Sequence, residues 1–336
     1  MRRVTILLAV GLVGCAASPT AGAPTPTGEN SSPVPPTSAV ATLPAALEGR
    51  ILLGNRDTFY LANADGSAVE QLADPRQYCC LARISPDHSR ILTMPGTDQT
   101  GAVTGGTLTL QQPHFDLLPS ADPTLNLVPE AWSPDGTRIA FEGWDDSDPN
   151  RTGIYTARIA DGTDMTRVTN VAGRAHDSPL DYSPNGQQLV FYRAVRAEPD
   201  FPIDIGGSLW VVNVDGNDAH RLDTGTVRPW WWARWSPDGS TIVFGAERLQ
   251  STGGLWTIKP DGSSLTVLVR GSASQFPVGP VWSPDGSAVM FAMNPITDAF
   301  QHPDNEIDVV SADGNGLTPV IVGPGYKRLS EWWKGQ

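Results

Sequence analysis

The feature that most constrains the fold of this 336-residue chain is a turn motif that returns about every 50 residues. Five segments carry it: RISPDHSRILTM, AWSPDGTRIAFEG, DYSPNGQQLVFYR, RWSPDGSTIVFGA and VWSPDGSAVMFAM, with motif serines Ser85, Ser133, Ser183, Ser236 and Ser283. Their separations are 48, 50, 53 and 47 residues. Self-similarity at such a period indicates a repeat architecture in which each unit is one small supersecondary structure.

Each repeat is typical of four antiparallel strands joined by tight turns. Proline presets the backbone of a type I turn, serine and aspartate can cap nearby N–H groups, and glycine supplies the positive φ that re-enters a strand. Alternating apolar residues flank the motif, and a second turn signal, Asp-Gly, recurs in LANADGS, ARIADGT, VVNVDGN, TIKPDGS and VVSADGN. Four such strands in about 50 residues form one blade of a β-propeller. We therefore predict an all-β fold.

The end of the chain predicts how the ring of blades closes. The segment LSEWWKGQ begins like the first strand of another repeat and then stops, with Trp332 in the place of the aromatic residue before the turn. Residues 49–72 supply the other three strands of that repeat. We expect a six-bladed β-propeller over residues 46–336, in which the N- and C-terminal strands pair in one four-stranded blade and leave no exposed sheet edge.

The repeats resemble the Pro-Asp type of propeller repeat, which is found in TolB-like periplasmic propellers and in the propeller domains of prolyl-oligopeptidase relatives. The resemblance covers residues 48–336 and rests on the five copies of the Ser-Pro motif. It implies the six-bladed, TolB-like fold. The sequence has no Gly-x-Ser-x-Gly nucleophile motif, so we do not expect the activity of the peptidase branch.

The first 45 residues are predicted to lie outside the propeller. MRRVTILLAVGLVGC has two arginines, a short apolar stretch and then Cys15, and it resembles a bacterial lipoprotein signal peptide whose lipobox cysteine is acylated. An ordinary secretory signal is the alternative. Residues 16–45 are rich in Ala, Pro, Thr and Ser, a composition typical of a disordered tether. We expect a protein of the bacterial cell envelope, held on the extracytoplasmic face of a membrane by its lipid.

Charge excludes one class of partner. The formal net charge is −13 and the pI is about 4.7, with no basic run after residue 3. Nucleic-acid binding requires a concentrated Lys/Arg surface, so no nucleic-acid partner is expected.

Candidate ligand-binding residues lie on the connections between strands. In a four-stranded blade the Ser-Pro-Asp-Gly and Asp-Gly turns share one face, which we call the short-turn face, and the longer connections share the opposite, long-loop face. The longer connections are residues 94–106, 143–153, 193–207, 245–254 and 293–305. Loops on a rigid scaffold commonly carry binding functions.

The most conspicuous cluster near that face is RPWWWARW. We assign Trp232 and Trp235 to packing between blades, and we consider Trp230 and Trp231 as candidates for a ligand platform, with Arg228 as an anion or carboxylate partner. The alternative is that these tryptophans also belong to the core.

Acidic residues and histidine offer a second possible site. His176, Asp177 and Asp181, with Glu130 and Glu331 on equivalent first strands, could converge near the channel as a metal or acid/base site, and His176 and Asp177 are also candidate ligand-binding residues. No paired-ligand spacing is present, so no metal and no cofactor are assigned. The acidic residues Asp145, Asp146 and Asp148 are interpreted as a solvated surface, and Cys79 and Cys80 as ordinary buried thiols.

Two functions are compatible with these features. The favoured one is non-catalytic binding of a protein, a peptide or an envelope glycan on the long-loop face. The alternative is a metal-assisted hydrolase or lyase that acts on a sugar or lactone. Specific metal retention with a rise in Tm would favour the enzyme.

Overall fold

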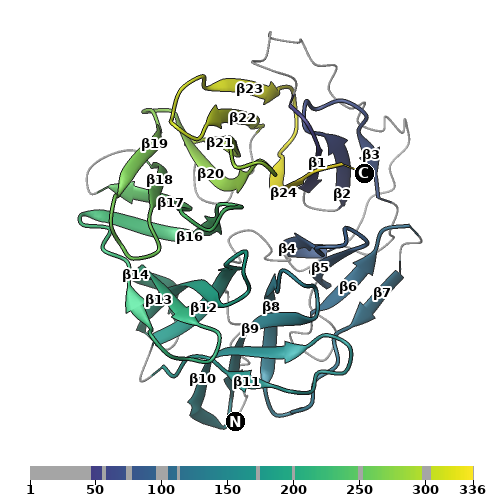
Figure 1. The fold of residues 1–336 in the computed structure, drawn as a ribbon, viewed down its shortest axis with the longest axis vertical. Helices are drawn as coiled ribbons and strands as arrows, with labels where there is room; N and C mark the ends of the chain where they lie inside the picture. Colours follow the sequence, from purple (N-terminus) through teal and green to yellow (C-terminus); the bar gives the residue numbers. More distant parts are fainter. Residues whose placement is uncertain are drawn as a thin grey trace, which may run out of the picture.

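A computed structural model describes residues 47–54, 58–72, 78–95, 105–111, 114–171, 175–198, 201–248, 253–296 and 304–335. These residues form six four-stranded antiparallel sheets in a ring around a central axis (Figure 1). The prediction of an all-β, six-bladed propeller is confirmed. Cys15, the signal segment 1–15 and the tether 16–45 lie outside the described residues. The part of the chain that the structure describes contains no helix long and apolar enough to cross a membrane.

The six sheets have the same strand order, with the first strand of each repeat innermost and the fourth outermost. Blade 1 contains β24 (Arg328–Trp333), β1 (Arg50–Gly54), β2 (Phe59–Asn63) and β3 (Glu70–Gln71); blade 2 contains β4 (Tyr78–Ile84), β5 (Arg90–Pro95), β6 (Gly106–Thr109) and β7 (His114–Leu117); blade 3 contains β8 (Asn126–Trp132), β9 (Arg138–Asp145), β10 (Asp148–Arg158) and β11 (Thr166–Arg167). Blade 4 contains β12 (Ala175–Tyr182), β13 (Gln188–Glu198), β14 (Phe201–Asn213) and β15 (His220–Arg221); blade 5 contains β16 (Val227–Trp235), β17 (Ile242–Arg248), β18 (Gly254–Ile258) and β19 (Thr266–Arg270); blade 6 contains β20 (Gln275–Trp282), β21 (Ala288–Pro295), β22 (Glu306–Ser311) and β23 (Thr318–Ile321).

The first and last strands of the propeller, β1 and β24, close the ring in blade 1, as the sequence predicts. β24 pairs antiparallel with β1, and Trp332 faces Ile51 in the register. Trp332 and Trp333 are 8% and 9% exposed, and they belong to different hydrophobic clusters. The cluster of Trp332 joins blade 1 to blade 6, whereas that of Trp333 joins blade 1 to blade 2. The last strand therefore contributes a buried tryptophan to each of the two interfaces of blade 1, with blade 6 and with blade 2.

The repeated turn motif builds the short-turn face. Each motif serine is buried and donates its hydroxyl to the Asp or Asn two residues later, as Ser133 does to Asp135 at 2.6 Å, and it accepts the N–H of the fifth residue on, as from Arg138 at 2.9 Å. The motif glycine has positive φ, 70° at Gly136, and a Cβ there would lie 3.6 Å from Pro86 of the preceding blade. The same stacking recurs around the ring. The motif therefore sets both the turn and the contact between neighbouring turns.

The prediction of a long loop is wrong for two segments, residues 143–153 and residues 193–207. Residues 143–153 form a tight hairpin, because β9 runs to Asp145 and β10 begins at Asp148. Residues 193–207 are likewise mostly strand, since β13 and β14 continue to Glu198 and from Phe201. These strands have 11 and 13 residues, while the second and third strands of blade 5 have seven and five. Blade 4 therefore extends further than blade 5 on the long-loop side.

Candidate functional site

The innermost strands β24, β4, β8, β12, β16 and β20 surround the central axis of the ring (Figure 1), and the region they enclose is called the channel below. Each has an irregularity in its register with the second strand of its blade. Such a β-bulge leaves a residue outside the ladder pairing and redirects its backbone groups. The carbonyls of Glu130, Leu180 and Ser330, at three of the bulges, accept hydrogen bonds from arginine side chains. The bulges thus provide polar acceptors within the channel.

Two arginines cross the channel to reach those carbonyls. Arg83 on β4 donates to the carbonyl of Glu130 at 3.2 Å and to that of Leu180 at 2.7 Å. Arg234 on β16 donates to the carbonyl of Leu180 at 3.4 Å and to that of Ser330 at 3.2 Å. Both guanidinium groups lie 3.4 Å from the same Oε1 atom of Glu331. These contacts connect blades 1 to 5.

Three carboxyl groups share this cluster, which we call the channel cluster: Arg83, Arg234, Glu130, Asp181 and Glu331. Loss of solvation inside the channel raises the pKa of Glu130, Asp181 and Glu331 to about 7 each, against the opposing pull of Arg83. Asp181 also accepts the backbone N–H of Trp235 at 2.9 Å. At neutral pH each of these acids is therefore partly protonated, while the two arginines stay charged.

The structure brings together only part of the predicted acidic site. The carboxyl groups of Glu130, Asp181 and Glu331 all lie within electrostatic reach of Arg83, so the acids gather around an arginine that the sequence prediction did not include. His176 and Asp177 lie at the opposite end of β12 from Asp181. Among the described residues, no group of three or more His, Cys, Asp or Glu is arranged to hold a metal ion.

Asp177 and His176 are both buried near the long-loop end of β12. Asp177 is 0% exposed and accepts two hydrogen bonds of 2.6 Å from Arg193 on β13. The guanidinium of Arg193 also lies 4.7 Å from the ring centre of Trp210 on β14. On the other face of β12, Ser178 donates to the buried Glu142 of blade 3 at 2.7 Å. These contacts fix the base of the long β13–β14 hairpin.

Arg228, Trp230 and Trp231 lie on β16, the innermost strand of the adjacent blade 5. Arg228 is exposed. Trp230 is half-buried and packs edge-on against Trp232 and against Phe276 of blade 6, with ring centres 6.0 and 5.6 Å apart. The side chain of Trp231 lies outside the described residues, as do those of Cys79 and Cys80. A ligand-binding role for Arg228, Trp230, Trp231, His176 and Asp177 stays a prediction.

The acidic residues around Asp145 differ from the sequence interpretation. Asp145 is 8% exposed, and it accepts hydrogen bonds from Ser147 and from Arg151 at 2.7 Å, which lower its pKa to about 2. Arg151 also pairs with Asp122. The interpretation as a wholly solvated acidic surface is therefore wrong for Asp145, although Asp146 is exposed.

Sequence reasoning missed the channel arginines, although a signal was present. Arg83, Asp181, Arg234 and Glu331 occupy the same place in their repeats, two residues before the motif serine or its equivalent, where blades 3 and 6 have Ala131 and Val281. A charged residue at a recurring position on the innermost strand marks a group that faces the channel.

The fold and the channel cluster define a six-bladed β-propeller with a polar centre that links its blades. The sequence model of the family described as the TolB beta propeller domain matches residues 54–334. The chain belongs to this family.

Known proteins are similar to this chain in sequence or in fold. An uncharacterized protein of Agrobacterium fabrum is 32% identical over 135 residues, which cover 38% of this chain and 41% of that protein. This chain therefore spans less than half the length of that relative. The structure of TolB from Acinetobacter baumannii superposes with a TM-score of 0.64 at 17% identity, over 88% of this chain and 68% of that one. Putative TolB from Agrobacterium tumefaciens gives 0.60 at 19% identity, over 85% and 99%. At these identities the two structures show a shared fold.

Proposed function

We propose that this protein is a lipid-anchored propeller of the bacterial cell envelope that binds a protein, a peptide or an envelope glycan on its long-loop face without catalysing a reaction. The observation that carries the proposal is the difference between the two faces of the ring. The short-turn face repeats one tight turn, whereas on the other side the β13–β14 hairpin extends blade 4. An irregular surface on a rigid ring is suited to recognition.

Two features support the position of the binding surface. The channel cluster connects five blades and occupies the centre, so it stabilises the ring on which the long-loop face is built. The ion pair between Asp177 and Arg193 holds the base of the β13–β14 hairpin in a fixed orientation. A partner would then meet a preorganised surface, which reduces the entropic cost of binding.

The location is supported by two independent features. Membership of the TolB beta propeller domain family fits an envelope protein. The sequence around Cys15 fits acylation, and residues 16–45 could hold the propeller away from the lipid surface.

The experiment uses the full chain in mild detergent, immobilised and exposed to an extract of bacterial envelopes. Arg228→Ala removes an exposed charge from the first strand of blade 5 on the long-loop side. Lys259→Ala removes an exposed charge from the same blade at the short-turn face and serves as the matched control. We expect one envelope component to be retained by the wild type and by Lys259→Ala, with at least about tenfold weaker retention by Arg228→Ala. Equal retention by the two variants, or none by the wild type, would contradict the proposal.

A further inference from the structure

Two blades lack the tryptophan that stands before the motif serine, or its equivalent, in the other four. Blade 2 has Ile84 at this position, and blade 4 has Tyr182. The tryptophans are Trp132, Trp235, Trp282 and Trp332. Between blades 2 and 3, the guanidinium of Arg90 lies 5.5 Å from the ring centre of Trp132, whose indole N–H donates to the carbonyl of Arg83 at 3.0 Å. At this interface the arginine therefore lies over the aromatic ring of the neighbouring blade.

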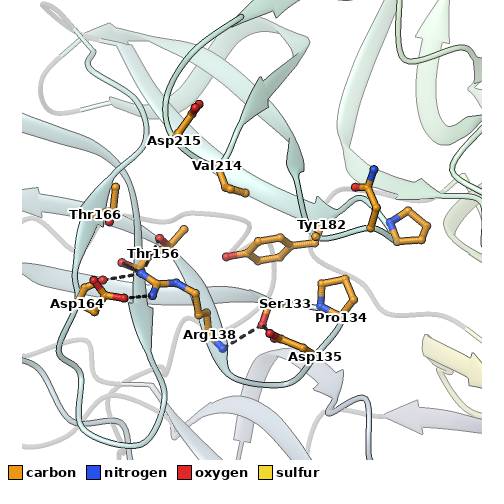
Figure 2. A pocket seen from close by; sticks show the side chains of 13 residues that line it. Ser133, Pro134, Asp135, Arg138, Thr156, Asp164, Thr166, Tyr182, Val214 and Asp215 are labelled. Atoms are coloured by element: carbon orange, nitrogen blue, oxygen red, sulfur yellow. Dashed lines mark hydrogen bonds and ion pairs between the residues drawn. The ribbon is translucent and has the colours of Figure 1, made fainter.

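Between blades 3 and 4, the equivalent arginine, Arg138, has its guanidinium on Asp164 and Thr156 of its own blade. Arg138 begins the second strand of blade 3 as Arg90 begins that of blade 2. Its guanidinium instead pairs with Asp164 at 2.6 Å and donates to the carbonyl and hydroxyl of Thr156 at 3.3 and 3.2 Å. A pocket of about 680 Å³ lies between these blades at the short-turn face (Figure 2). This volume is within the range of small-ligand sites.

A buried hydroxyl points into the pocket. Tyr182 is 5% exposed, and Figure 2 shows its ring directed between Arg138 and Val214. Its hydroxyl has no hydrogen-bond partner among the described residues. Burial raises its pKa, so the hydroxyl stays neutral and can both donate and accept. An unpaired buried polar group is costly, and a bound ligand could satisfy it.

The charges around the pocket define the kind of ligand. Asp135, Asp164 and Asp215 line it and are exposed, whereas Arg138 is the one cationic side chain among its lining residues. The Ser133 hydroxyl lowers the pKa of Asp135, and the N–H of Asn217 lowers that of Asp215, so both carboxylates are ionised at neutral pH. The lining is therefore net negative and favours a cation.

Apolar groups form the rest of the wall. Pro134, Pro184 and Val214 contribute carbon surface beside the carboxylates. A long side chain with an apolar stem and a charged end matches this combination, because its stem can pack while its head reaches polar groups.

We propose that the pocket between blades 3 and 4 binds a lysine or arginine side chain from a basic peptide segment of a partner protein. The stem packs against the two prolines and Val214, and the cationic head donates to the Tyr182 hydroxyl and to a carboxylate of the lining. This site lies on the short-turn face, so it is separate from the surface proposed above and does not depend on it.

The test measures binding of a fluorescent acetylated, amidated trilysine peptide to the full chain in detergent at low salt, by anisotropy. Tyr182→Trp introduces the residue found in four of the other blades and should raise Kd at least tenfold, because the indole occupies the pocket. Tyr182→Phe removes only the hydroxyl and should raise Kd a few-fold. A triglutamate peptide should not bind.

Asp215→Asn provides a variant that preserves the turn, and the chain offers a matched control. Asp215 accepts from the backbone and side chain of Asn217 at 2.9 and 3.0 Å, and Asp313 accepts from Asn315 at 3.0 and 3.0 Å in blade 6. Asp215→Asn should weaken binding several-fold, whereas Asp313→Asn should change Kd less than twofold. Equal effects of these two variants, or unchanged binding by a folded Tyr182→Trp protein, would overturn the proposal, as would no binding of trilysine to the wild type.

Discussion

Removal of residues 327–336 should unfold the propeller, although it deletes only ten residues from a chain terminus. The deletion removes β24, the innermost strand of blade 1, and leaves β1 without its five registered partners. It also removes Glu331, the carboxylate that both channel arginines contact. Blade 1 would lose its link to the channel cluster and expose a sheet edge.

The magnitude follows from the two tryptophans. Trp332 and Trp333 are at most 9% exposed and pack in separate clusters, so each loses its own set of packing partners on deletion. Truncation of one buried tryptophan costs about 3–5 kcal/mol, which makes about 6–10 kcal/mol for the pair. This is comparable with the whole net stability of a typical domain, about 5–15 kcal/mol.

Urea unfolding of the full chain, followed by tryptophan fluorescence, checks this expectation. The control deletes only residues 335–336, which lie beyond β24. The control should keep the wild-type midpoint, and the longer truncation should be insoluble or show no cooperative transition. A soluble protein without residues 327–336 that melts within a few degrees of wild type would refute the closure argument.

Three further predictions concern the channel, the anchor and β16. Between about pH 4.3, the unperturbed pKa of Glu, and pH 7, the folded state holds a proton on Glu331 that the unfolded chain releases. The stability from this proton is therefore present below about pH 4.3 and is lost as the pH rises to 7. The difference between the urea midpoints at pH 5 and pH 8 should be smaller in Glu331→Gln than in wild type. Equal differences in the two proteins would contradict this prediction. Cys15→Ser should abolish labelling by a fatty-acid analogue, and mutant labelling as strong as wild type would exclude acylation at this thiol. Trp230→Ala should lower Tm by several degrees because the ring packs against Phe276. Arg228→Ala should leave Tm within about one degree because Arg228 is exposed. A thermal melt in which Arg228→Ala lowers Tm more than Trp230→Ala would show that the packing is misassigned.

The repeat was enough to predict the blades and their closure. The Ser-Pro-Asp-Gly turn depends on local chemistry, so its position in the sequence identifies where a first strand ends. The hairpin at Asp145–Asp148 could not be predicted in the same way, because DDSDPN has the composition of a loop while Arg151 neutralises Asp145 from across the turn. That compensation depends on a side-chain contact that composition does not contain.

The channel cluster required knowledge of which bulge carbonyls face the axis. Arg83 donates to residues 47 and 97 positions away, so no local pattern pairs them. Position within the repeat nevertheless marks the arginines, and it also marks Tyr182 and Ile84 as the residues that replace tryptophan in blades 4 and 2. Comparison of equivalent positions among repeats therefore predicts more of the candidate sites than motifs alone.

The most direct measurement of the proposed function is site-specific photo-crosslinking in bacterial cells. Benzoylphenylalanine would replace Arg228 at the long-loop face or Asp261 at the short-turn face of the same blade, both exposed in the structure. The proposal predicts a discrete crosslinked species with an envelope component from position 228 and none of the same mass from position 261. The same species from both positions, or none from position 228, would contradict recognition on the long-loop face.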